Sequence, residues 1–313
     1  MPTSPSSLAA GSRLGRRSLR LITVCGALAL AGSVLAPALT ADASPVDRTK
    51  PNAAARKAGV ERGNATMGWQ DGVERAVGEA SSTSDARLAG YAKITRAGKL
   101  VPMTGVLGID VSSYQGVVDW VSFVKVERSF AYVKATEGTS YRNPYFAGQF
   151  GGAKTAGMYV GAYHFANPGG KSGKKQAKYF VKHGGAWTKD GKTLPGVLDI
   201  EYNPYGGGMC YGKSKKRMVA WISDFVKTYK RLTTRDVVIY TTADWWSKCT
   251  GNTTKFRYTN PLWVARWTPT TGPGVLPGGW PYYTFWQYSS KVIDQNRFSN
   301  SLARLEVLAT KAK

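Results

Sequence analysis

Strand and helix patterns alternate from Thr104 to the end of the chain, and this alternation restricts the fold more than any other feature of the sequence. Short runs of apolar and β-branched residues predict strands, and longer stretches with one apolar face predict the helices between them. The predicted strands are 106–111, 130–135, 159–165, 196–201 and 237–241, and the predicted helices are 118–126, 144–157, 174–187 and 214–232. This order, without internal repeats, predicts an α/β barrel of the TIM-like type.

Helical patterns become rare in the last part of the chain. Residues 243–249 give at most one short turn of helix, whereas 262–266, 283–288 and 292–294 predict strands joined by Pro- and Gly-rich loops. We therefore expect an irregular (β/α) barrel that has lost helices near its end. An open doubly wound sheet is the alternative, but no Gly-rich phosphate loop follows the first strand, which disfavours that fold.

The N-terminus has the pattern of a secretory signal peptide, which we place at residues 1–43. Four arginines precede an apolar run over residues 21–39, and residues 41–43 supply the small-x-small pattern of a cleavage site. A membrane anchor is the alternative, but Gly32 and Pro37 interrupt the apolar run. Removal of this segment predicts a secreted, extracellular protein without a membrane anchor.

Residues 44–103 are rich in Ala, Gly, Ser and charged residues and contain few large apolar side chains. Such a composition buries little surface, so we interpret this region as a low-complexity arm or a pro-segment, with short helices around residues 72–90. The barrel domain is then expected over residues 104–313.

Two cysteines, Cys210 and Cys249, remain after removal of the signal peptide. In an oxidising compartment, one disulfide between them is the natural inference. A nucleophilic or metal-binding cysteine is the alternative, but the two histidines of the chain, His164 and His183, show no ligand spacing to either cysteine. We therefore expect neither a metal nor a cofactor.

The chain is strongly basic, with a formal net charge of +24 that remains about +21 after removal of the signal peptide. A surface of this charge attracts polyanions. Lysines and arginines are spread over the whole sequence without a recognisable nucleic-acid motif, so we expect no nucleic-acid partner and favour an extracellular anionic polymer, such as those of a bacterial cell wall. Lysines at helical spacing over residues 171–182 predict a solvated helix face that could also contact such a wall. We expect a monomer.

Two acids interrupt the apolar strand at residues 196–201. Val197, Leu198 and Ile200 are typical of a buried strand, yet Asp199 and Glu201 lie in the same run. Because side chains alternate along a strand, the two carboxyl groups share one face, about 6.6 Å apart along the chain. A structural role would demand two buried cations on that face. Paired buried carboxyls are instead the environment in which one group keeps a proton and serves as a general acid.

Acids and aromatic residues recur at the ends of the other predicted strands, where the catalytic groups of a barrel lie. Rings stack on the C–H faces of sugars while carboxylates and amides bind sugar hydroxyls, so this combination predicts a carbohydrate site. The candidates at these ends are Asp110, Tyr163, Tyr240, Arg266, Trp267, Gln287, Tyr288 and Asp294. Glu137 and His164 lie nearby, but a loop ion pair and a core histidine explain them better, so both stay outside the catalytic set.

Seven segments, in the same order, resemble the motifs of glycoside hydrolase family 25, the lysozymes of the Chalaropsis type. They are residues 108–115, 132–138, 161–165, 198–201, 263–267, 286–288 and 294–298. The resemblance covers residues 105–298. It implies an irregular β/α barrel that cleaves the β-1,4 bond between N-acetylmuramic acid and N-acetylglucosamine in the glycan strands of peptidoglycan.

The same resemblance implies roles for individual residues. Glu201 would be the general acid, and Asp199 would hold its proton electrostatically or orient the acetamido group of the substrate. Asp110 and Asp294 would orient the sugar from opposite sides of the site. Further substrate contacts would come from Tyr163, Tyr240, Trp267, Trp286 and Gln287.

Two other functions remain open. A barrel of this type without activity would bind cell walls through its positive charge, although the intact Asp199 and Glu201 argue against it. A chitinase of the acetamido-assisted kind would carry additional aspartates before its catalytic glutamate, where this chain has Leu194 and Val197.

Overall fold

The structure is a computed structural model that describes residues 50–57, 60–62, 65–68, 105–267 and 272–311. The predicted signal peptide and the helices expected around residues 72–90 lie outside the described residues. Within the described part of the chain, no helix is both long enough and apolar enough to cross a membrane.

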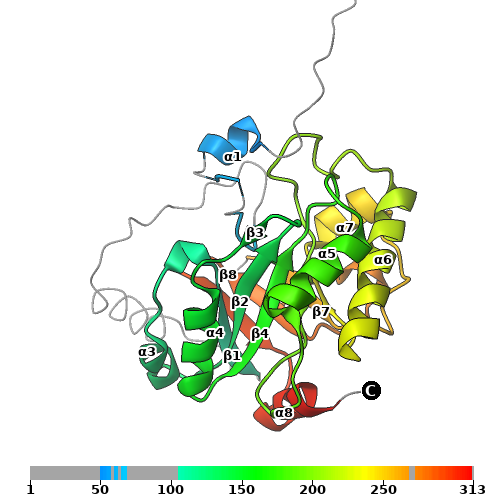
Figure 1. Ribbon diagram of the computed structural model, residues 1–313. Coiled ribbons are helices and arrows are strands. Elements are labelled where there is room, and N and C mark those ends of the chain that lie inside the picture. The colour runs from blue at the N-terminus through cyan, green and yellow to red at the C-terminus, as the bar shows by residue number, and fades with distance from the viewer. Residues whose placement is uncertain (1–49, 58–59, 63–64, 69–104, 268–271, 312–313) are drawn as a thin grey trace, which may run out of the picture. The chain divides into compact units, whose positions relative to one another are not determined.

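Eight of the nine strands in the described residues close into a barrel (Figure 1). Parallel pairing of β1 with β2 completes the ring, and β9 runs antiparallel to both of its neighbours, β8 and β1. The strands are β1 (Val106–Val111), β2 (Arg128–Glu137), β3 (Tyr141–Arg142), β4 (Tyr159–Phe165), β5 (Val197–Asp199), β6 (Val238–Thr241), β7 (Leu262–Ala265), β8 (Phe285–Ser289) and β9 (Asp294–Phe298). The short β3 pairs only with the end of β2. The irregular barrel predicted from the sequence is confirmed.

Helices lie around the outside of the strands (Figure 1). Two of the longer ones begin at a serine whose hydroxyl accepts a backbone N–H, Ser172 from Lys175 and Ser214 from Arg217. The helices are α1 (Ala53–Lys57), α3 (Trp120–Lys125), α4 (Phe146–Thr155), α5 (Gly173–Phe180), α6 (Lys215–Thr233), α7 (Ala243–Thr250) and α8 (Leu302–Thr310). A π-helical turn follows α5 at Val181–Gly185, and 3-10 turns occur at Ser113–Gln115 and Pro277–Gly279.

The core has an outer layer between strands and helices and an inner layer inside the barrel. In the outer layer, Leu198 and Ile200 pack in one cluster with Ile222 and Phe225 of α6. The inner layer is largely aromatic. Its members include Phe130, Tyr132, Tyr163, Tyr240, Trp263, Phe285 and Phe298.

Glycines on two strands make room for these rings. A Cβ on Gly161 of β4 would come within 2.0 Å of the Tyr132 ring, and one on Gly108 of β1 would come within 2.5 Å of the Phe130 ring. Any side chain at either position would displace an inner-layer ring. This close approach explains why glycine interrupts two otherwise apolar strands.

The last helix, α8, closes one end of the barrel. Its buried Leu305 and Ala309 join the inner layer beside Tyr159, at the start of β4, and Leu194, just before β5. Trp187 also donates its indole N–H to the Ala309 carbonyl at 3.1 Å. Neither α8 nor β3 was predicted from the sequence. With the starts of the parallel strands covered, the functional groups lie at the opposite end.

Candidate active site

Four acidic side chains lie at the barrel end opposite α8. Asp110 is the next-to-last residue of β1, and it pairs directly across the strands with Asp294, the first residue of the antiparallel β9. Asp199 ends β5, and Glu201 follows two positions later. All four side chains belong to residues that are at most 5% exposed. The structure therefore brings together the four acids that the sequence singled out.

The alternation of side chains directs Asp199 and Glu201 to the inside of the barrel. Leu198 and Ile200 belong to the outer layer, whereas Val197 belongs to the inner layer. Asp199 and Glu201 follow Val197 at intervals of two residues, so their side chains point to the same face of the strand, as predicted. The strand itself is shorter than expected, since it ends at Asp199 rather than at Glu201.

Tyr163 and Tyr240 lie close to these carboxyl groups. Burial is the main cause that raises the pKa of both phenols well above their ordinary value, and the negative charges add to it. Three aspartates act on Tyr163, and the same three together with Glu201 act on Tyr240. Because β4 and β6 flank β5, the two tyrosines border the acids from both sides.

Two amide side chains hold Asp110 in place. Gln287 Nε2 and Asn296 Nδ2 both donate to Asp110 Oδ2, at 2.9 Å and 2.7 Å. An ionised carboxylate accepts such bonds and is oriented by them. Gln287 was a predicted site residue, whereas the sequence analysis assigned no role to Asn296.

Tryptophan N–H groups fix the orientation of both amides. Trp267 Nε1 donates to Gln287 Oε1 at 3.0 Å, and Trp263 Nε1 donates to Asn296 Oδ1 at 3.1 Å. An indole nitrogen can only donate, so each amide must turn its oxygen to the indole and its NH2 group to Asp110. The Tyr240 hydroxyl donates to the same Gln287 oxygen at 2.7 Å. Asp110 is thus positioned by a network that spans β6, β7, β8 and β9.

Lys134 is a fully buried cation that was not predicted from the sequence. Its Nζ lies 2.6 Å from Glu137 Oε2, and it also donates to the Ala65 carbonyl. Burial raises the pKa of Glu137, and the charge of Lys134 opposes that effect. Residues three apart on a regular strand point to opposite faces, so an irregularity in β2 between Lys134 and Thr136 accounts for the contact. Such an irregularity is not visible in the sequence.

His164 belongs to the outer layer rather than to the site. Its ring stacks on Phe225 with centroids 5.3 Å apart, and its two nitrogens lie 2.8 Å from Thr136 Oγ1 and 3.0 Å from Gln176 Oε1. Burial lowers the pKa of this imidazole to about 3, so the ring is neutral. It is a satisfied core histidine, as the sequence suggested.

The two tryptophans predicted to stack on sugar have different surroundings. Trp267 is half-buried, and its N–H contacts the site through Gln287. Trp286 precedes Gln287 on β8 and therefore points to the other face, where it joins the outer layer and donates to the Arg266 carbonyl at 2.9 Å. The structure brings Trp267 to the acids and does not bring Trp286 there.

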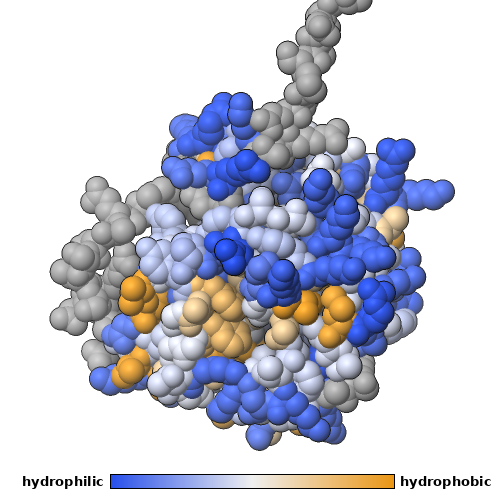
Figure 2. Space-filling model, in the orientation of Figure 1, coloured by the Kyte–Doolittle hydropathy of each residue, from blue (hydrophilic) through white to orange (hydrophobic). Residues whose placement is uncertain are grey.

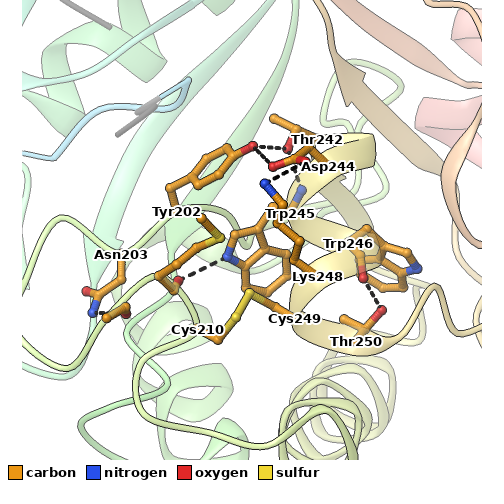
Figure 3. The surroundings of a disulfide bond; sticks show 12 residues. Tyr202, Asn203, Cys210, Thr242, Asp244, Trp245, Trp246, Lys248, Cys249 and Thr250 are labelled. Atoms are coloured by element: carbon orange, nitrogen blue, oxygen red, sulfur yellow. Dashed lines mark hydrogen bonds and ion pairs between the residues drawn. A yellow bond between two sulfur atoms is a disulfide. The ribbon is translucent and has the colours of Figure 1, made fainter. Parts of the chain in front are cut away.

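The predicted disulfide between Cys210 and Cys249 is present (Figure 3). It joins the loop that follows Glu201 to α7, with the two Cα atoms 5.3 Å apart. Hydrogen bonds reinforce the same junction, because Tyr202 donates to Asp244 at 2.7 Å and Trp245 donates to the Met209 carbonyl at 3.2 Å (Figure 3). The chain on one side of the acids is therefore fixed covalently.

The site is suited to acid–base chemistry on a polar substrate. Carboxyl groups supply and orient protons, and the neighbouring amides, phenols and indoles can bind hydroxyl and acetamido groups. Among the described residues, no group of three or more His, Cys, Asp and Glu side chains is arranged to hold a metal ion.

Comparison with known proteins gives a consistent result. The sequence profile of the glycosyl hydrolases family 25 matches residues 109–296. Lysozyme M1 of Streptomyces globisporus is 43% identical over 306 residues, which cover 95% of this chain and 97% of that protein. The N,O-diacetylmuramidase of Chalaropsis sp is 47% identical over 211 residues, covering 66% of this chain and 99% of that protein.

Solved structures give the same picture of the fold. The bacterial lysozyme from Streptomyces coelicolor is 50% identical and superposes with a TM-score of 0.64, covering 67% of this chain and 99% of its own. The matched segments include Asp110, Asp199, Glu201 and Asp294, since all four lie within residues 109–296. The chain belongs to the glycosyl hydrolases family 25 and is a glycoside hydrolase.

Proposed function

We propose that this protein is a secreted lysozyme that hydrolyses the β-1,4 bond between N-acetylmuramic acid and N-acetylglucosamine in peptidoglycan. The observation that carries the proposal is the gathering of four buried carboxyl groups beside Tyr163, Tyr240 and Trp267 at one end of the barrel. Relatives that are named as a lysozyme and an N,O-diacetylmuramidase support this choice of substrate.

In this proposal Glu201 is the general acid. It protonates the glycosidic oxygen as the bond to the anomeric carbon breaks. Asp199 lies one pleat deeper on the same face, where its charge stabilises the proton on Glu201 and orients the acetamido group of the substrate. The acetamido oxygen then takes the place of an enzyme nucleophile, and water completes the hydrolysis.

Asp110 and Asp294 bind the sugar from the opposite side of the barrel. Gln287 and Asn296 keep the Asp110 carboxylate oriented as an acceptor for a sugar hydroxyl. Tyr163 and Gln287 supply further hydrogen bonds to the sugar, and Trp267 offers a ring face for stacking. The Tyr240 hydroxyl donates to Gln287 and so helps to orient its amide.

The basic surface holds the enzyme against its polymeric substrate. Hydrophilic side chains cover much of the face that carries α5 and α6 (Figure 2). Exposed lysines there include Lys171, Lys174, Lys175, Lys178 and Lys182. Such a surface raises the local concentration of an enzyme on an anionic cell wall, and the attraction weakens as salt is added.

Mass spectrometry of digested peptidoglycan tests the proposal. Muropeptides with reducing muramic acid ends are expected. Reducing glucosamine ends would show that the other glycosidic bond is cut. Wall binding without any soluble product would favour a catalytically silent wall-binding barrel instead.

A further inference from the structure

Part of the N-terminal region is docked on the barrel at two places. The first lies on the loop that follows Glu201. Pro51 forms an antiparallel bridge with Tyr205, Asn52 N–H donates to the Pro204 carbonyl at 2.8 Å, and Asn52 Nδ2 donates to the Asn203 carbonyl at 3.2 Å. This is the same loop that the disulfide joins to α7.

The second place is the site itself, which is contacted by residues 65–68, here called the plug. Met67 is fully buried and belongs to the same inner cluster as Tyr163, Tyr240 and Trp263. Ala65 is also fully buried, and its carbonyl accepts the buried ammonium group of Lys134. The plug therefore fills space inside the barrel end rather than resting on its rim.

The backbone of Gly68 touches the residues to which we assign the chemistry. Its N–H donates to Glu201 Oε1 at 2.6 Å. Its φ is +84°, and a Cβ there would come within 2.6 Å of the Trp267 ring and 3.0 Å of Gln287 Oε1. Only glycine fits such a position without displacing these side chains. The Tyr163 hydroxyl also makes a hydrogen bond with the Met67 backbone.

These contacts use the atoms that a sugar would need. Glu201 Oε1 cannot approach a glycosidic oxygen while it accepts the Gly68 N–H, and Gly68 also lies close against the Trp267 ring. A bound glycan and the plug therefore exclude each other.

We propose that the N-terminal region acts as an intramolecular inhibitor through its described residues 50–57, 60–62 and 65–68, and that the barrel end is a binding site for it, so that the chain stays latent until this region is separated from the barrel. The inference rests on the proposed function, because it assumes that the plugged site is the one that cleaves peptidoglycan. It extends the interpretation of residues 44–103 as a pro-segment by giving the segment a place to bind.

Covalent attachment explains how so small a plug can be effective. A segment tethered to its site acts at an effective concentration of roughly millimolar, so even a weak contact keeps the site occupied. Once the segment is no longer covalently attached to the barrel, it must bind from dilute solution, so it leaves the site.

The test compares a long chain that starts at Ser44 with a short chain that starts at Gly105. Both are assayed on soluble peptidoglycan fragments, so that access to an intact wall plays no part. We expect the long chain to show a kcat/KM at least about tenfold lower, which corresponds to a plug in place in about nine of ten molecules. Equal rates would overturn the inhibitor and leave the lysozyme proposal intact.

Two substitutions in the long chain separate the plug from a general effect of length. Met67→Asp places a charge inside the barrel end beside the four acids, and Gly68→Ala adds the Cβ that has no room. Each is expected to bring kcat/KM to within about twofold of the short chain, because the site is then free. The matched control Ala53→Asp adds the same charge at an exposed position of α1 and is expected to stay latent. Met67→Asp and Gly68→Ala chains as slow as the parent would refute the plug.

Binding is measured separately from activity. A synthetic peptide of residues 50–68 is titrated into the short chain by calorimetry, with a peptide of the same composition in scrambled order as the control. Binding of the native peptide alone is expected, together with competitive inhibition. A short chain without activity would reject the proposed function, and a peptide that does not bind at millimolar concentration would reject the inhibitor in either case.

Discussion

The two sides of the acidic site are held by different kinds of contact. On the β1 and β9 side, Asp110 is fixed by Gln287 and Asn296, and these contacts belong to the barrel itself. On the β5 side, Glu201 accepts a hydrogen bond from Gly68, which lies 133 positions earlier in the chain. Asp110 is therefore held by contacts within the barrel, whereas Glu201 also keeps a contact with the N-terminal region, which we propose to be removable. A residue that binds sugar benefits from fixed geometry, and a residue that delivers a proton must be released to act.

The largest expected effect comes from removing the acid on the β5 side of the site. Glu201→Gln in the short chain keeps the size of the side chain but removes its ability to act as an acid. We expect kcat to fall by about 10²- to 10⁴-fold, the usual contribution of a general acid, with little change in KM. Release of soluble muropeptides measures the rate. Glu306→Gln on α8, an exposed carboxyl, is the control and should leave the rate unchanged, and a Glu201→Gln chain with the parent rate would show that the acid is another residue.

The next effect concerns the covalent support of the Glu201 side. The disulfide between Cys210 and Cys249 closes a loop with a sequence separation of 39. We expect reduction to lower the free energy of unfolding by about 3 to 4 kcal/mol in the chain-entropy description. Urea unfolding with and without reductant measures the change, and the double variant Cys210→Ser with Cys249→Ser should show no further response to reductant. Identical curves would argue for free thiols in solution.

A smaller effect is expected on the Asp110 side. Asn296→Asp keeps the shape of the side chain but replaces the NH2 group that donates to Asp110 by an oxygen. Loss of a hydrogen bond to a charged group is worth about 1.5 to 3 kcal/mol, so we expect KM to rise by about 10- to 150-fold with a smaller change in kcat. The matched control is Asn260→Asp, another buried asparagine, whose side chain hydrogen-bonds to Val237 and Thr259 and which should lower stability without raising KM. A rise in KM with both variants would mean that a buried charge, rather than Asp110, is responsible.

The sequence predicted the barrel and its acids because both depend on local patterns. Alternation along a strand is enough to put Asp199 and Glu201 on the inner face, and strand ends are visible as ends of apolar runs. The same rule should have excluded Trp286, because Trp286 and Gln287 are neighbours on β8 and cannot both face the inside.

Other features could not be read from the sequence because they depend on register or on distant segments. The bond from Asn296 to Asp110 requires the pairing of β1 with β9, which brings residues 186 positions apart into contact. The contact of Lys134 with Glu137 requires an irregular strand. Composition suggested that residues 44–103 bury little, and this is consistent with a plug of only a few small or flexible residues. A low average burial says nothing about whether Met67 has a specific place to bind.

The smallest expected effect comes from His164 on the outer face of the barrel, and it tests whether that face is independent of the acidic site on the inner face. His164 stays neutral when folded because burial lowers its pKa to about 3, whereas an unfolded histidine titrates near 6.5. Below about pH 6.5 the unfolded chain binds a proton that the folded chain does not, so this residue makes stability fall as the pH drops toward 3. Between pH 8 and pH 5 the loss is about 2 kcal/mol. His164→Gln should flatten that part of the urea-unfolding profile and leave the pH dependence of kcat unchanged, since His164 faces Phe225 and Gln176 rather than the acids. If the activity profile shifts as well, the outer layer and the acidic site are coupled through β4, and the separation of the two faces is incomplete.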